Sequence, residues 1–311
     1  MRKHSGILLA LPAWLWLVCF FVVPVAIVVV FSFGEKPDIF STHSLEHLSF
    51  DRYAEVFTPA FFTTFLNTLW IGLAGTAICL VIGMPVAYWM AVKVRPERRG
   101  LLVALVMVPF WTNFLVRTIG WQILLAPEGW LSTLAQGIGL PAFEILNTRQ
   151  AVLLGVVYNY LPLMILPLFV AFDRVSGPLR EASADLGAPK WTTFFRITLP
   201  LAQPGIIAGV LLVYIPLMGD YITATVLGGA KGNMVGQLVA GQFQTALNWS
   251  LGSAMAVVLI GIILVSVAIG AGIVWLVTLP ARSRNRLVLG PAQPAGARAV
   301  TAPAVVEGAG A

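Results

Sequence analysis

The chain is poor in charged residues. Aspartate, glutamate, lysine and arginine make up 10% of its 311 residues, whereas a soluble globular domain carries about 25%. Cysteine is also scarce: Cys19 and Cys79 both lie in uncharged runs, and we expect them to be small apolar side chains without a disulfide or a metal. The scarcity of charge excludes an ordinary soluble domain.

Residue patterns that enzymes need are missing as well. The chain has no G-x-x-x-x-G-K-[ST] phosphate loop, and its nearest glycine-rich piece is Leu227–Asn233. His43 and His47, with Glu46 between them, have a spacing that could bind zinc, but a solvated loop is the simpler interpretation and we assign them no role. We therefore expect no catalytic residue, no bound cofactor or metal, and no nucleic-acid partner.

Long uncharged runs account for the scarcity of charge. Hydrophobic residues make up 59% of the chain, and its mean hydropathy is +0.89. A run of about 20 apolar residues is long enough to cross the hydrocarbon core of a bilayer. The sequence therefore predicts an all-α polytopic membrane protein with six transmembrane helices, near Ile7–Phe33, Phe62–Ala91, Leu101–Leu125, Gln150–Phe172, Leu201–Val226 and Leu251–Leu279.

Basic residues are unevenly divided between the two sides of this bundle. Fourteen lie in the N-terminus, the link between helices 2 and 3, the link between helices 4 and 5, and the tail; four lie on the other side, namely Lys36, Arg52, Arg149 and Lys231. Because Lys and Arg concentrate in cytoplasmic loops, we expect both termini in the cytoplasm. The tail at 281–311 turns Ala/Pro/Gly-rich, and we expect it to be disordered.

The fourth predicted helix contains two prolines, Pro162 and Pro167, which remove backbone donors and favour kinks or unwinding. Tyr158, Asn159 and Tyr160 precede them directly. This combination indicates either a deformable helix that lines a polar path or ordinary packing within the bundle.

The link between helices 4 and 5 is unlike the rest of the chain, because charged, small and aromatic residues alternate in it. Pro178–Leu186 is predicted to form a helix that ends at Gly187, a natural left-handed cap, and Pro189 starts a second helix over Lys190–Ile197. Pro200 then marks the start of the fifth span. Clustered apolar residues in this link indicate either a docking surface or an amphipathic element on the membrane: Leu179, Ala182, Leu186, Trp191, Phe194 and Phe195.

The same link carries a motif. Its spacing, E-A-x-x-x-x-G, nine residues, then I-x-L-P, resembles the EAA loop of permease subunits of binding-protein-dependent ABC importers. Ser183 stands where that family usually has alanine. Three further stretches are similar to the permeases of spermidine/putrescine importers, in particular the first permease of the pair, and the similarity runs from about Phe50 to the sixth helix: Val108–Leu125, Ala151–Leu168 and Pro200–Phe243.

The resemblance implies a type I ABC importer permease-like bundle in the bacterial inner membrane. A permease core at 62–280 would follow an N-terminal segment, 1–61, and would contain the loop at 173–200 as a cytoplasmic coupling helix. The implied partners are a cytoplasmic ATPase dimer that uses the ATP, a second homologous permease, an extracytoplasmic substrate-binding protein and membrane lipid. The implied coupling residues are Glu181, Ala182, Ser183, Asp185, Gly187, Lys190, Ile197, Leu199 and Pro200.

Two charged residues, Arg117 and Asp220, lie inside the predicted spans. Such residues are costly in hydrocarbon and usually pair or line an aqueous path. At 1.5 Å per residue, both lie about 24 Å from the cytoplasmic ends of their helices. Because the depths match, an ion pair between them is one interpretation. The other is that Asp220 meets a cationic substrate near the outer gate.

A polyamine needs carboxylates or aromatic faces for its ammonium groups. The candidates for the path are Trp111, Tyr158, Asn159, Tyr160, Tyr214 and Tyr221. The predicted spans contain a single acidic residue, which is too few to pair with the several ammonium groups of a polycation. We therefore expect the binding protein to discriminate between solutes. Two alternatives stay open: a permease for another small solute, such as an opine, a phosphonate or an organic acid, and a proton-coupled secondary transporter, which would need titratable residues at mid-membrane.

Overall fold

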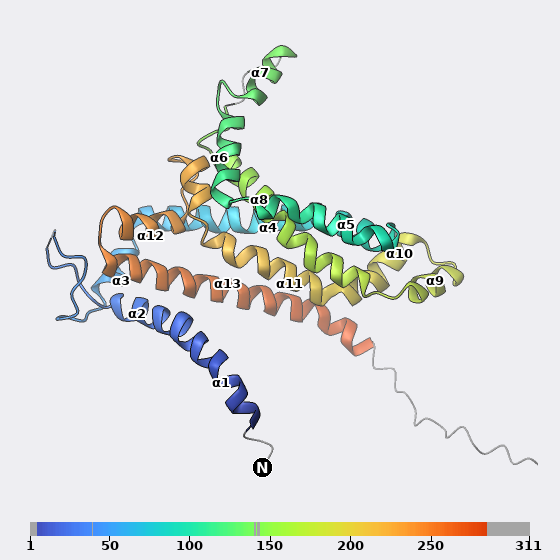
Figure 1. Ribbon diagram of the computed structural model, residues 1–311, viewed down its shortest axis with the longest axis horizontal. Helices are drawn as coiled ribbons and strands as arrows, with labels where there is room; N and C mark the ends of the chain where they lie inside the picture. Colours follow the sequence, from blue (N-terminus) through green and yellow to red (C-terminus); the bar gives the residue numbers. More distant parts are fainter. Residues whose placement is uncertain (1–4, 39, 140, 142–143, 285–311) are drawn as a thin grey trace, which may run out of the picture. The chain divides into compact units, whose positions relative to one another are not determined.

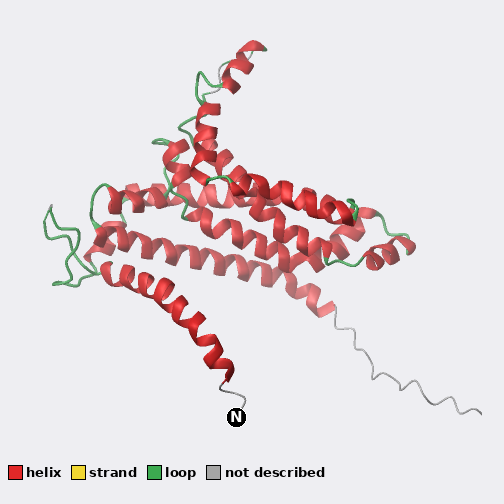
Figure 2. Ribbon diagram, in the orientation of Figure 1, coloured by secondary structure: helices red, strands yellow, loops and turns green. Residues whose placement is uncertain are grey.

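The computed structural model describes residues 5–38, 40–139, 141 and 144–284, and their regular structure is helical (Figure 2). The all-α prediction is therefore confirmed. The chain forms two compact units, Met1–Val265 and Ser266–Ala311, whose boundary falls inside the last helix. Residues 281–284 of the predicted disordered tail belong to that helix, and the rest of the tail lies outside the described residues.

The helices are labelled in Figure 1. They are α1 (Ser5–Leu17), α2 (Val23–Phe31), α3 (Asp51–Val56), α4 (Pro59–Val92), α5 (Pro96–Met107), α6 (Phe114–Leu125), α7 (Trp130–Gly137), α8 (Arg149–Asp173), α9 (Gly177–Asp185), α10 (Lys190–Thr193), α11 (Leu199–Met218), α12 (Val235–Gln244) and α13 (Trp249–Arg284). Shorter pieces join them: π-helical turns at Val18–Val22, Phe194–Thr198 and Ala224–Gly228, and a 3₁₀ turn at Val108–Trp111.

Five segments of the described chain are long and apolar enough to cross a membrane: Leu11–Phe31, Pro59–Val92, Arg149–Asp173, Lys190–Met218 and Trp249–Leu276. A sixth span results if Pro96–Trp111 and Phe114–Gly137, which are bent by 81°, cross together. The spans predicted over 62–91 and 150–172 correspond to α4 and α8. α8 continues through Pro162 and Pro167 without a break.

The continuous helix predicted over 101–125 is wrong, because the chain breaks between α5 and α6. Pro109 lies in the 3₁₀ turn that follows α5, and Thr112 after it is extended. Asn113 then starts α6: its Oδ1 accepts hydrogen bonds from the N–H groups of Leu115, at 2.8 Å, and Val116, at 3.4 Å. A capping residue inside an apolar run starts a new helix, which average hydropathy does not register.

The fifth predicted span, 201–226, is shifted toward the N-terminus. One helical run covers Lys190–Met218, so the second helix of the link continues into the span and does not stop before Pro200. The run ends at Gly219, whose N–H bonds to the carbonyl of Pro216 at 3.2 Å. The chain is non-helical at Asp220 before a short helical turn begins.

A π-helical turn explains why Pro200 does not interrupt this run. In the turn at Phe194–Thr198, the N–H of Leu199 bonds to the carbonyl of Phe194, five residues back. A proline in an α-helix lacks a donor and clashes with the carbonyl four residues back. The wider turn changes the hydrogen-bond register just before the proline, and another such turn precedes Pro24.

Glycines bring α4, α8 and α11 together in the core of the Met1–Val265 unit. A Cβ added at Gly83 of α4 would lie 3.1 Å from Cγ of Met164 on α8. One added at Gly75 would lie 3.1 Å from Cδ1 of Leu217 on α11. Small residues at such positions let helices approach closely in a membrane, where van der Waals packing holds them together.

Replacing Gly83 by leucine is expected to destabilise the bundle by about 1–3 kcal/mol, because overpacking forces neighbouring side chains out of their preferred rotamers. The midpoint of thermal unfolding in detergent measures this effect. Gly261→Leu in α13 is the matched control, since nothing lies within 4 Å of a Cβ built there. Equal losses in the two variants would contradict the packing of α4 on α8.

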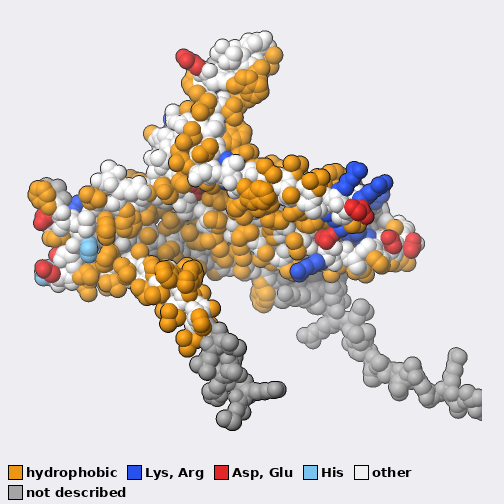
Figure 3. Space-filling view, in the orientation of Figure 1, with side chains coloured by type: hydrophobic (Ala, Val, Ile, Leu, Met, Phe, Trp, Pro, Cys, Tyr) orange, Lys and Arg blue, Asp and Glu red, His pale blue; other side chains and the backbone are white. Residues whose placement is uncertain are grey.

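Basic side chains gather at one end of the Met1–Val265 unit. Figure 3 shows them where α5 begins and next to α9. Arg99, near the start of α5, forms an ion pair with Asp173 at the end of α8. This is the end that the charge distribution of the sequence assigns to the cytoplasm.

Candidate functional site

The link between α8 and α11 forms a helix, a glycine turn and a second helix. Gly187 has φ +77°, a left-handed conformation that glycine adopts without strain. The N–H of Gly187 bonds to the carbonyl of Ala184 at 2.8 Å, and the N–H of Ala188 bonds to the carbonyl of Ser183 at 3.1 Å. These two bonds make a Schellman motif, which ends α9 and turns the chain toward α10.

Large apolar side chains lie exposed on this link. Leu186 is 88% exposed, Trp191 74% and Phe195 56%, and the rings of Trp191 and Phe195 stack with centroids 6.1 Å apart. We call these three residues, together with the exposed Leu179, the link face. A cluster of exposed aromatic and aliphatic side chains on a projecting element is typical of a docking surface.

Phe194 does not belong to the link face, contrary to the sequence prediction. Its ring packs edge-on against Tyr88 of α4, with centroids 5.1 Å apart, and lies 6.3 Å from the ring of Phe172 on α8. It therefore joins the core. The helical repeat turns Phe194 inward and its neighbour Phe195 outward, and the sequence pattern alone did not separate them.

Most of the polar residues predicted for coupling are on the outside of the link. Glu181, Asp185 and Lys190 are exposed, as are Ala182 and Pro200, while Ile197 and Leu199 are half-buried. Ser183 is buried, and its hydroxyl lies 2.9 Å from that of Thr193, which is also buried. Sequence reasoning missed Thr193. No signal in the sequence pointed to it, because its role depends on a contact across the turn at Gly187.

Asp220 lies in the break after α11 and is 6% exposed. Its Oδ1 accepts a hydrogen bond from the N–H of Thr223 at 3.0 Å, and its Oδ2 accepts one from the hydroxyl of Thr223 at 2.6 Å. The carboxylate therefore caps the helical turn that follows. The phenol of Tyr160 on α8 also interacts with this carboxylate.

Arg117 and Asp220 do not form an ion pair in this structure. The ion pairs among the described residues are Arg52–Glu55 and Arg99–Asp173. The Arg117 guanidinium instead lies over the rings of Phe110 and Phe114, with its Cζ 5.8 Å and 5.6 Å from their centroids. Its Nε and Nη1 are buried without a hydrogen-bond partner in the described part of the chain.

The aromatic candidates for a path lie in different surroundings. Tyr160 and Tyr214 are buried, Tyr158 and Tyr221 are partly exposed, and Trp111 is 77% exposed. The structure brings Tyr158, Asn159 and Tyr160 against α6, where the amide of Asn159 donates to the hydroxyl of Thr118 at 3.2 Å and Tyr160 meets Phe114.

Trp121 is a neighbour of this group that sequence reasoning missed. Its ring meets that of Tyr158 edge-on, with centroids 5.4 Å apart. The two rings border a recess of about 440 Å³ between α4, α6 and α8. Trp121 lies in a stretch already judged similar to known permeases, but one tryptophan among many apolar residues gave no separate signal.

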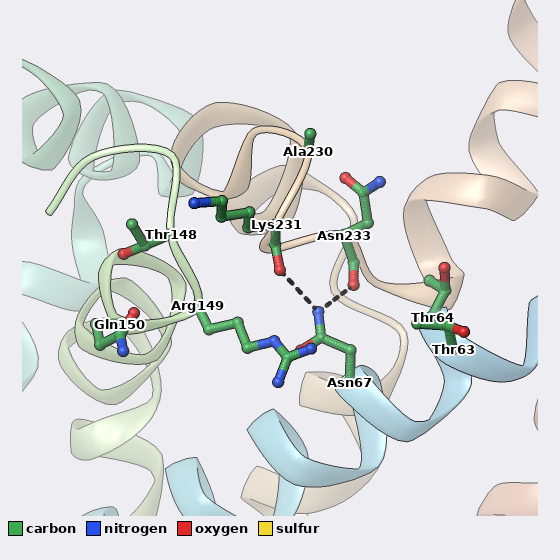
Figure 4. Close-up of a pocket in the computed structure, with 9 residues that line it drawn as sticks. All are labelled: Thr63, Thr64, Asn67, Thr148, Arg149, Gln150, Ala230, Lys231 and Asn233. Carbon is green, nitrogen blue, oxygen red and sulfur yellow. Dashed lines mark hydrogen bonds between the residues drawn. The ribbon is translucent and has the colours of Figure 1, made fainter. Parts of the chain in front are cut away.

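A polar recess of about 480 Å³ lies at the opposite end of α4 and α8 from the link (Figure 4). Asn67 is buried at its base, and its amide donates to the backbone oxygens of Asn233, at 2.6 Å, and Lys231, at 3.5 Å. The Oδ1 of Asn67 is buried without a partner among the described residues. Two cationic side chains and several hydroxyls line the recess: Thr63, Thr64, Thr148, Arg149 and Lys231.

Comparison with protein families and curated proteins gives matches over most of the chain. Residues 83–279 match the family described as binding-protein-dependent transport system inner membrane component. The chain is 40% identical over 244 residues to the spermidine/putrescine transport system permease protein PotB of Haemophilus influenzae, covering 78% of this chain and 84% of that protein. It is 37% identical over 246 residues to PotB of Escherichia coli, covering 78% and 88%.

Solved structures share the fold at lower identity. A bacterial ABC transporter involved in the import of the acidic polysaccharide alginate contains a chain that matches with a TM-score of 0.68 and 16% identity, covering 88% of this chain and 95% of that one. The MetNI methionine ABC transporter, in an inward-facing conformation, matches with a TM-score of 0.52 and 20% identity, covering 71% and 99%. At these identities the likeness concerns the fold.

Proposed function

The chain belongs to the family of binding-protein-dependent transport system inner membrane components, and on that premise we propose that it is the permease subunit of an ATP-driven polyamine importer. One observation carries the proposal: identity of 37–40% to spermidine/putrescine permeases over 78% of the chain. The helical bundle has the type I importer permease fold that its structural relatives show. In this role the chain forms half of the path through the membrane.

The energy for transport comes from a partner in this proposal. The ATPase binds and hydrolyses ATP, and this chain contributes no catalytic residue. The link face, with Glu181, Asp185 and Lys190 around it, is the surface that we propose for ATPase docking. Support comes from its exposed aromatic residues and from the likeness in fold to a chain of the MetNI methionine ABC transporter.

The orientation follows from this assignment. Docking of a cytoplasmic ATPase requires the link to face the cytoplasm, and the basic side chains at that end of the unit agree with the positive-inside rule. Both termini then lie in the cytoplasm of a bacterium, with the spans in the inner membrane and in contact with lipid. The polar recess around Asn67 then opens outward.

The polar recess is suited to an extracytoplasmic binding protein. Arg149 and Lys231 would repel a polyamine, so the recess is not a cargo site. We propose that it receives acidic side chains of the binding protein when that protein delivers the solute. A second, homologous permease completes the path in this proposal. The alginate transporter that shares this fold is known in complex with a periplasmic protein that carries its solute, which supports a docking site for such a protein.

Reversing the charge of Lys231 is expected to weaken docking of the binding protein roughly tenfold or more, because like charges brought together at an interface cost several kcal/mol. Binding of the purified substrate-binding protein to the permease complex in nanodiscs, measured at low ionic strength, gives the effect. Lys231→Arg is the control, because it keeps the positive charge at the same place in the recess and is expected to retain the affinity. Equal affinities for Lys231→Glu and the unmodified complex would contradict the docking role.

Uptake of radiolabelled spermidine and putrescine tests the substrate. We expect ATP-dependent accumulation of a polyamine in proteoliposomes that contain the complete complex. ATP-dependent uptake of a radiolabelled opine, phosphonate or organic acid, without uptake of either polyamine, would instead identify a permease for that solute. Uptake driven by a proton gradient without ATP would contradict the importer class itself.

A further inference from the structure

The hydroxyl groups of Ser183 and Thr193 bridge the two helices of the link. They lie 2.9 Å apart, across the turn at Gly187, and both residues are less than 10% exposed. Thr193 also lies 3.5 Å from the carbonyl of Pro189, to which its hydroxyl donates. Either hydroxyl can be the donor in the bridge, and the other accepts.

The bridge sits between an outer and an inner surface of the link. Leu186 and Trp191 of the link face, on either side of the turn, are exposed, whereas Ser183 and Thr193 are turned inward. A hydrogen bond shielded from water is more costly to break than one at the surface, because no water is at hand to replace the lost partner. The bridge therefore fixes the angle between α9 and α10 more firmly than the short turn alone.

Behind the bridge, α10 is fastened to the bundle. Phe194, the residue after Thr193, packs on Tyr88 of α4 and on Phe172 of α8. Tyr88 and Phe172 also meet each other edge-on, with centroids 5.6 Å apart. Edge-to-face aromatic contacts favour one relative geometry. A continuous set of contacts thus leads from α9 through the bridge to two membrane-spanning helices.

We propose that the Ser183–Thr193 bridge is a latch that makes α9 and the α10–α11 run move as one body, so that force applied to the link reaches the bundle. Ser183 and Thr193 are positioning residues: they contact neither ATP nor solute. The inference rests on the proposed function, since the latch matters only if an ATPase moves the link. Without the bridge, α9 would rotate about Gly187, and part of the movement that the ATPase imposes on the link would not reach the membrane-spanning helices.

The number of ATP molecules hydrolysed per solute taken up tests the latch. The complete complex in proteoliposomes is compared with Ser183→Ala, Thr193→Val and the double variant. Each single variant is expected to raise this ratio about threefold, a factor within the range of one hydrogen bond. The double variant should raise it no further, because either change alone breaks the same bond. Thr193→Ser, which keeps the hydroxyl, should retain the ratio of the unmodified complex.

Thr192→Val is the matched control, one position from the bridge and on the same helix. Alanine is the residue that the permease family usually has at position 183. Ser183→Ala is therefore expected to fold even if Thr193→Val does not. The latch would be overturned if Ser183→Ala left the ratio of ATP hydrolysed to solute taken up unchanged, or if the double variant raised it by the product of the two single effects. In either case, ATP-driven uptake by the unmodified complex would still uphold the proposed function. No ATP-driven uptake by the unmodified complex would overturn both.

Discussion

Reversing the charge of Glu181 is expected to abolish ATP-driven uptake while the chain still inserts into the membrane. Glu181 is exposed on α9, beside the link face. In the proposed docking, a lysine there would bring a like charge or an unpaired charge against the part of the ATPase that meets the Glu181 carboxylate, at a cost of several kcal/mol. That cost corresponds to at least about a hundredfold loss of ATPase affinity. Pull-down of the ATPase by the tagged permease measures it.

Glu97→Lys is the control for this change. Glu97 is an exposed acidic residue in the first turn of α5 at the same end of the unit, outside the link. We expect this variant to retain the ATPase and to transport. If Glu181→Lys bound the ATPase and took up solute as the unmodified chain does, the docking role of α9 would be refuted.

Asp220→Asn is expected to fold but to lose most of its uptake, roughly tenfold or more, whereas Asp220→Leu is expected to accumulate poorly. Asparagine keeps an oxygen that can accept from the N–H of Thr223, but leucine leaves this N–H and the Thr223 hydroxyl without their acceptor. Each buried group left without its partner costs about 1–3 kcal/mol. The amount of membrane-inserted protein measures the effect of losing the hydrogen bonds to Thr223. The initial rate of uptake measures the effect of losing the negative charge.

The two variants separate the two roles of this carboxylate. Normal uptake by Asp220→Asn would show that the negative charge does not meet the cationic cargo. Exchange of Asp220 and Arg117 is not expected to restore activity, because Arg117 lies over two phenylalanine rings and not against the carboxylate. Recovery of uptake in that exchange variant would establish the ion pair that their matching depths predicted.

Hydropathy predicted the membrane-spanning segments well and their interruptions poorly. α4 and α8 follow the predicted ranges because each is one uninterrupted apolar helix. The bend between α5 and α6 depends on a single cap, Asn113, whose effect is local and does not change an average over 20 residues. Likewise, the end of α11 depends on Gly219 and the capping carboxylate of Asp220, which sequence reasoning had placed inside a helix.

The link shows a similar division between what the sequence reveals and what it does not. The turn at Gly187 was predictable, because a left-handed cap needs glycine and prolines flank the two helices. The inward face of the π-helical turn after α10 was not predictable, since Phe194 and Phe195 are identical in chemistry and differ only in which way the helical run turns them. The Ser183–Thr193 bridge depends on contact across a turn, which spacing along the chain does not fix.

ATP-dependent uptake of radiolabelled spermidine by the purified complex tests the central claim most directly. The tagged chain is isolated from its own membrane, the proteins that accompany it are identified, and the complex is reconstituted into proteoliposomes with ATP on the side of the link. We expect an ABC ATPase, a second permease and uptake that requires both ATP and the binding protein. A chain that purifies without an ATPase, or that moves no solute when ATP is supplied, would contradict the account.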